Sequence, residues 1–90
     1  MSVKVRLHQY FQDFAHGQEM VEADGNTVRE LVDDLDAKFP GIKDHLLDKR
    51  GRIQGFVELF INNQVVFPEN TNAPLKDGDQ VEVLTIVAGG

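Results

Sequence analysis

Residues 27–41, TVRELVDDLDAKFPG, hold the clearest helix pattern in the chain and decide its fold class. Apolar side chains recur at helical spacing on one side, and charged side chains occupy the other. Thr27 and Glu30 have the spacing of a capping box, in which the threonine hydroxyl accepts a backbone N–H and the glutamate reaches back. The Pro-Gly pair that follows ends the helix. We therefore predict an amphipathic helix over residues 28–38, with an apolar side that must be covered.

Strand patterns flank this helix on both sides. Apolar and polar residues alternate near the start of the chain and again in its second half, which is typical of half-buried strands. Asn62 and Asn63 stand where a two-residue hairpin turn belongs, since asparagine tolerates a positive φ. We expect an irregular segment over residues 10–17, a short helical turn over 42–47 and a loop over 48–55. The expected strands are residues 3–7, 18–23, 56–61, 64–67 and 80–86.

The resulting order is strand, strand, helix, then three strands. A single helix has to cover one face of one sheet. This order predicts an α+β fold with the β-grasp arrangement, a mixed sheet of about five strands packed on one main helix. We expect the last strand to lie beside the first in the sheet centre. Residues 1–86 form the predicted domain, and residues 87–90 a flexible tail.

The composition narrows the function classes. The chain has 90 residues, a net charge of −6 and no cysteine. Without cysteine there are no disulfides, no thiolate catalysis and no cysteine-based zinc site. The acidity argues against nucleic-acid binding, which needs clustered Lys and Arg. No apolar run has the length of a membrane span, and the chain begins directly with a strand pattern. We therefore expect a cytoplasmic protein without a signal peptide.

The titratable side chains do not form a catalytic pattern. The three histidines lie in different segments and lack metal-ligand spacing, and the helix aspartates form a solvated acidic side rather than an acid–base pair. These residues are His8, His16, His45, Asp33, Asp34 and Asp36. Ser2, the single serine, has no base beside it in the sequence, and no glycine-rich phosphate loop is present. We predict no metal site, no bound cofactor and no independent enzyme.

One face of the sheet is predicted to carry exposed apolar side chains. If Val81 and Val83 point into the core, the alternation turns their apolar neighbours in the last strand outward. In the third strand Leu59 and Ile61 are expected to point inward, which turns Phe60 outward. A contiguous apolar face suggests a partner surface. Two alternatives are that the segment over residues 10–16 covers this face, or that the exposed apolar residues are scattered and have no binding role. The predicted surface comprises Phe60, Leu84 and Ile86.

The last four residues, Val87, Ala88, Gly89 and Gly90, suggest a chemical role. Two glycines lack Cβ atoms, so this segment can pass through a narrow channel. Four residues reach about 13 Å, enough to deliver a carboxylate into the active site of another protein. ATP can convert that carboxylate into an acyl-adenylate, from which a sulfur or nitrogen nucleophile displaces AMP. A frayed end without function is the alternative.

Three stretches together resemble the MoaD/ThiS family of ubiquitin-like sulfur carrier proteins. They are GNTVRELVDDLDAKFPGI at residues 25–42, FVELFINNQVV at residues 56–66 and DGDQVEVLTIVAGG at residues 77–90. The resemblance covers nearly the whole chain, in the family's order. The longer middle, residues 42–55, is most similar to the CysO-like subgroup.

This resemblance implies a mechanism and a set of sites. A ubiquitin-activating-like adenylyltransferase would use ATP to adenylate Gly90, and a sulfur donor would convert the adenylate into a thiocarboxylate. A second enzyme would hold the acceptor of that sulfur. Ala88 and Gly89 would thread the channel. His8, Val65 and Leu84 fall where relatives place an apolar docking surface, with His8 as a polar substitute.

The resemblance leaves several functions open. Molybdopterin-type relatives carry prolines just before the tail, whereas this chain has Thr85 and Ile86, which predicts a strand that continues further. The favoured route leads to cysteine or homocysteine, and a molybdopterin synthase small subunit is next. A protein modifier, with Gly90 joined to a lysine, and a non-covalent β-grasp binding module are the other possibilities. We expect a free monomer.

Overall fold

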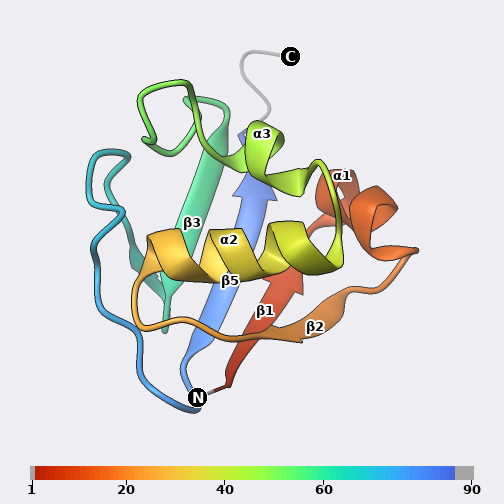
Figure 1. Cartoon of the computed structure of the whole chain (residues 1–90), viewed down its shortest axis with the longest axis horizontal. Coiled ribbons are helices and arrows are strands. Elements are labelled where there is room, and N and C mark those ends of the chain that lie inside the picture. Colours follow the sequence, from red (N-terminus) through yellow and green to blue (C-terminus); the bar gives the residue numbers. More distant parts are fainter. Residues whose placement is uncertain (1, 87–90) are drawn as a thin grey trace.

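The computed structural model describes residues 2–86, so the predicted tail at residues 87–90 lies outside the described residues. One mixed sheet packs on one main helix (Figure 1), as predicted. The strands are β1 (Val3–Leu7), β2 (Met20–Ala23), β3 (Val57–Ile61), β4 (Gln64–Val65) and β5 (Gln80–Thr85). The helices are α1 (Gln9–Gln12), α2 (Val28–Lys38) and α3 (Ile42–Leu46), and a 3₁₀ turn, η1, spans Asp13–Ala15.

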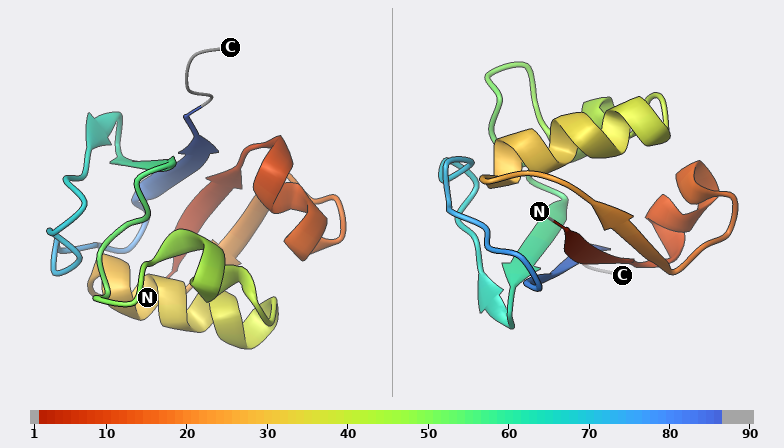
Figure 2. Two further views of the ribbon diagram at one scale, coloured as in Figure 1. Left: turned by 90° about the horizontal axis from the view of Figure 1, so that it is seen from above. Right: turned by 60° about the horizontal axis from the view of Figure 1, so that its bottom comes forward.

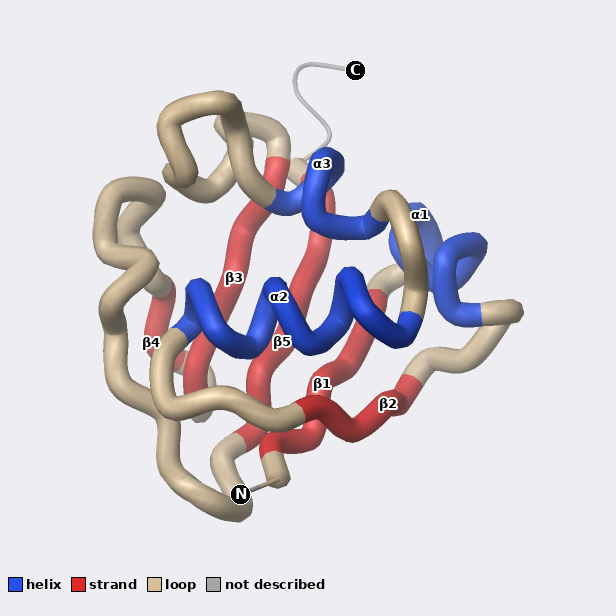
Figure 3. Tube along the Cα trace, in the orientation of Figure 1, coloured by secondary structure: helices blue, strands red, loops and turns tan. Residues whose placement is uncertain are grey.

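The strand order is β2-β1-β5-β3-β4, which places β5 in the middle of the sheet (Figure 3). β5 runs parallel to β1 and antiparallel to β3. The prediction that the last strand lies beside the first is therefore confirmed. Asn62 and Asn63 join β3 to β4 with φ angles of 49° and 71°, the positive values that a tight hairpin turn requires.

α2 begins and ends at the predicted residues. Thr27 caps it, since its Oγ1 accepts the backbone N–H of Glu30 at 3.2 Å. The Glu30 carboxylate accepts the backbone N–H of Asn26 at 2.9 Å. The glutamate therefore reaches the residue before the cap, and not the N–H of the cap residue that a capping box would offer. Four apolar side chains of α2 are fully buried against the sheet, namely Val28, Leu31, Val32 and Leu35.

The segment over residues 10–17, expected to be irregular, contains α1 and η1. His8 precedes α1 without a side-chain capping bond, so the sequence carries no start signal there. Tertiary contacts hold the segment, because Phe11 and Ala15 are fully buried and the side-chain amide of Gln12 donates to the carbonyl of Leu7 at 2.9 Å. The predicted helical turn over 42–47 is α3.

The core lies between the sheet and the helices. Views from other sides show α2 and α3 on one face of the sheet (Figure 2). Alternate residues of the three central strands point into this core and are almost completely buried, namely Val3, Val5, Leu7, Leu59, Val81 and Val83. The opposite face of the sheet, here called the outer face, carries the residues between them.

Candidate functional site

The orientation of β5 agrees with the sequence pattern. Val81 and Val83 are buried, whereas Leu84 is half-buried and Ile86 is 44% exposed. In β3, Leu59 is buried and Phe60 is half-buried on the outer face. The predicted outward direction of Phe60, Leu84 and Ile86 is therefore correct. Ile61, expected to point inward, is half-buried and packs against the core.

Apolar side chains cross the outer face obliquely. Phe60 lies opposite Val65 of β4 on one side and opposite Glu82 of β5 on the other. Leu84 lies opposite Glu58, so Phe60 and Leu84 are diagonal neighbours, within reach of each other's long side chains. We call Val65, Phe60 and Leu84 the apolar diagonal. Val65 is 47% exposed, and glutamates stand beside the diagonal on both flanks.

His8 lies at the β1 side of the apolar diagonal. Its backbone N–H donates to the carbonyl of Val83 at 3.0 Å, which continues the parallel pairing and sets His8 beside Leu84. Its Nε2 donates to the Glu82 carboxylate at 2.7 Å. The resemblance implies that relatives carry an apolar residue at this position. In this chain, His8 stands there and is paired with an acidic neighbour. Ile86 lies beyond this group, at the end of β5.

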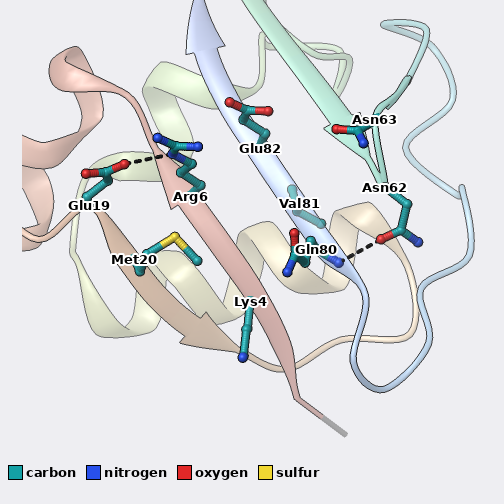
Figure 4. Close-up of a pocket in the computed structure, with 9 residues that line it drawn as sticks. All are labelled: Lys4, Arg6, Glu19, Met20, Asn62, Asn63, Gln80, Val81 and Glu82. Carbon is teal, nitrogen blue, oxygen red and sulfur yellow. Dashed lines mark hydrogen bonds and ion pairs between the residues drawn. The ribbon is translucent and has the colours of Figure 1, made fainter.

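A polar hollow of about 490 Å³ occupies the other half of the outer face (Figure 4). Arg6 pairs with Glu19 at 2.7 Å, and the backbone N–H of Gln80 donates to the Asn62 side-chain oxygen at 3.0 Å. Lys4, Met20 and Glu82 also line it. None of the residues that line this hollow was predicted to be a site residue. The charged residues that alternate with valines in β1 and β5 nevertheless indicated a polar face.

A second group, which sequence reasoning missed, surrounds the end of β5. The backbone N–H of Ile86 donates to the carbonyl of Phe56 at 2.8 Å. The Phe56 ring contacts Tyr10 of α1, with centroids 6.1 Å apart, and the Tyr10 hydroxyl shares a 2.9 Å hydrogen bond with His45 Nδ1 of α3. We call Tyr10, His45 and Phe56 the aromatic collar. Figure 1 shows α1, α3 and the end of β5 at the same end of the molecule.

Three aspartates serve the fold. The backbone N–H of Lys76, with the Asn62 amide, lowers the pKa of Asp79. The backbone N–H of Asp24 and the Lys38 ammonium lower the pKa of Asp34. Both carboxylates brace turns. Asp48 does the same in the loop after α3, where backbone N–H groups lower its pKa.

The described part of the chain contains no group of three or more residues that could hold a metal ion. The histidines are apart, since His8 pairs with Glu82, His45 with Tyr10, and the His16 ring lies against Phe39. Within residues 2–86 no helix has the length and apolar character needed to cross a membrane. The predicted tail residues Val87, Ala88, Gly89 and Gly90 lie outside the described residues.

A β-grasp sheet with an open outer face, from whose central strand the C-terminal segment departs, defines a ubiquitin-like protein. Over residues 5–90 the sequence matches the ThiS family. The chain belongs to the ThiS family, and it is a sulfur carrier protein and not an enzyme.

Three similar proteins place it within that family. The sulfur carrier protein CysO of Mycobacterium tuberculosis is 33% identical over 93 aligned residues, with all of both chains covered. The structure of the Amycolatopsis orientalis BexX/CysO complex contains a chain with a TM-score of 0.89 and 34% identity, covering 98% of this chain and 99% of that one. The small archaeal modifier protein 1 of Methanosarcina acetivorans has a TM-score of 0.80 and 26% identity, covering 99% and 96%.

Proposed function

We propose that Gly90 is the sulfur attachment point. A ubiquitin-activating-like adenylyltransferase would join its carboxylate to AMP from ATP, with release of pyrophosphate. Hydrosulfide provided by a sulfur donor would then attack the acyl carbon and expel AMP, leaving a thiocarboxylate and a released proton. The observation that carries this proposal is the family match, which extends through residue 90. The chain itself binds no cofactor in this scheme, since ATP belongs to the partner.

The acceptor route that we favour leads to cysteine or homocysteine. The full-length similarity to CysO supports it, as does the backbone at residue 86. Ile86 donates its N–H to Phe56, a bond that proline at this position could not make. Prolines before the tail mark the molybdopterin-type relatives, so this departure ranks a molybdopterin synthase small subunit second.

We propose the outer face as the docking surface for these partners. The residues are Phe60, Val65, Leu84, Ile86 and His8, which offer apolar area bordered by acidic side chains. The neighbour solved as a BexX/CysO complex is itself seen with a partner protein. In this proposal the free chain is a monomer that works in the cytoplasm, where ATP and a sulfur-accepting enzyme are at hand.

A protein modifier is the second candidate, favoured by the similarity to the small archaeal modifier protein 1. Both functions share the adenylate and diverge at the nucleophile, which is a sulfur donor in one case and a lysine amine in the other. A non-covalent binding module would need neither the adenylate nor a nucleophile.

Intact mass of the protein from its native host, with fragmentation, tests the proposal. We expect a species in which one oxygen of the Gly90 carboxylate is replaced by sulfur. Gly90 joined to lysines of other proteins would favour the modifier, and a carboxylate that is never altered would favour the binding module. As a control, deleting Gly90 should abolish adenylation and leave the thermal midpoint unchanged, because the described fold ends its pairing at residue 86.

A further inference from the structure

The aromatic collar lies where the chain leaves the sheet. Ile86 is bound through its backbone to Phe56, and Phe56 contacts Tyr10. Tyr10 is 44% exposed, Phe56 39% and Ile86 44%, and exposed apolar side chains that gather in one area mark an interaction site. Their exposed edges come from separate parts of the sequence and gather at one end of the molecule, around the base of the C-terminal segment.

Ring contacts and a hydrogen bond tie the collar to the rest of the fold. Tyr10 meets the fully buried Phe11 ring edge-on, with centroids 5.0 Å apart. The hydrogen bond from Tyr10 to His45 ties α1 to α3, and the His45 ring packs on Phe14 at 4.9 Å. A preorganised apolar surface loses little conformational freedom when a partner covers it. Its shape is therefore set before binding.

The length of the C-terminal segment limits how far a partner's active site can lie from this surface. Four residues separate Ile86 from the end of the sequence, and they span at most about 13 Å when fully extended. An enzyme that acts on the Gly90 carboxylate must bring the mouth of its active-site channel within that distance of Ile86. The rim of that mouth then faces the side chains around Ile86, whose main-chain partner Phe56 belongs to the collar.

We propose that the aromatic collar is the contact surface for the mouth of the adenylyltransferase channel, and that the rim of this mouth is apolar. This inference rests on the proposed function. The exposed collar residues Tyr10 and Phe56 are aromatic and the adjoining Ile86 is aliphatic, whereas the rest of the outer face interleaves its apolar side chains with Glu58 and Glu82. The collar therefore contributes apolar burial around the entering segment, and the outer face contributes recognition that depends on charge.

The test compares Phe56→Glu with Phe67→Glu in ATP–pyrophosphate exchange by the adenylyltransferase of the source organism. Phe67 is 64% exposed and follows β4, so it supplies the same change of residue and charge outside the collar. We expect Phe56→Glu to raise the KM for the carrier about tenfold or more, the size of an interface hot spot, with kcat within about twofold. Phe67→Glu should leave both constants within about twofold.

Equal kinetic effects of the two variants would overturn the collar proposal. Thermal midpoints check that both variants fold, and if Phe56→Glu does not, the uncharged pair Phe56→Ala and Phe67→Ala replaces it with the same expectation. Tyr10→Phe keeps the ring and removes only the hydroxyl, and it should raise KM by less than Phe56→Glu. Absence of exchange with the unaltered chain would instead refute the proposed function, and this inference with it.

Discussion

The backbone N–H of Ile86 donates to the carbonyl oxygen of Phe56 at 2.8 Å. Pairing between the ends of β3 and β5 therefore extends one residue beyond Thr85, the last residue of β5. The base of the C-terminal segment is held in the sheet through the main chain, which any residue with a backbone N–H at position 86 allows.

This bond predicts the effect of proline at that position. Ile86→Pro should lower the free energy of unfolding by about 1 kcal/mol, because proline cannot donate and the Phe56 carbonyl loses its partner. Urea unfolding measures the difference. Ile86→Ala is the control, since it removes side-chain atoms and keeps the N–H. If the two variants are equally stable, the bond does not hold the end of β5.

The outer face can be tested at Phe60. Lysine is the suitable substitute, because an acidic residue would stand directly opposite Glu82 and be destabilising. We expect Phe60→Lys to weaken binding to the adenylyltransferase about tenfold while the free energy of unfolding changes by less than about 1 kcal/mol. Titration calorimetry gives the affinity. Gln64→Lys, exposed on β4, makes the same charged residue outside the apolar diagonal and should bind normally.

Asp79 should contribute to acid sensitivity. Its pKa is lowered by the Lys76 backbone N–H and the Asn62 amide, whereas an unfolded aspartate titrates near about 3.9. The stabilisation is therefore present above about pH 4 and is lost as pH falls from there through the lower folded pKa. Asp79→Asn should show a shallower loss of stability between about pH 5 and pH 2 in urea titrations. An unchanged pH dependence of stability in Asp79→Asn would contradict this assignment.

Gly25 is required by a close backbone approach. A Cβ atom there would lie 2.5 Å from the backbone nitrogen of Leu31 and 2.9 Å from its Cα. Gly25→Ala should therefore cost about 1–3 kcal/mol, as overpacking does. A Cβ atom on Gly55 meets nothing within 4 Å, so Gly55→Ala should be neutral or slightly stabilising. Equal thermal midpoints for the two variants would contradict this reading of the turn before α2.

Local sequence signals predicted the parts of the fold that local interactions determine. Thr27 at the start and Pro40 after the end defined α2, and Val81 and Val83 gave the orientation of β5. The asparagine pair at 62–63 located the hairpin because its backbone requirement is a property of the residue itself. These features need no knowledge of distant segments.

The remaining parts depend on contacts between distant segments. α1 has only four residues and no side-chain cap, so the burial of Phe11, and not helix propensity, fixes it. The collar joins residues 10, 45 and 56, which no spacing pattern connects. The sequence indicated an apolar outer face. The register between β3 and β5 places Glu58 opposite Leu84, so the exposed apolar side chains form a diagonal and not a continuous patch.

The central position of β5 has a consequence for folding. In the sheet of residues 2–86, β5 joins the β1–β2 pair to the β3–β4 pair, so neither pair can complete the sheet alone. The parallel β1–β5 pairing closes a loop of more than 70 residues. Contacts so distant in sequence make folding slower. A chain that has not inserted β5 has neither an outer face nor a fixed base for its last residues. Partners that recognise both the outer face and the base of the last residues would therefore bind only fully folded molecules.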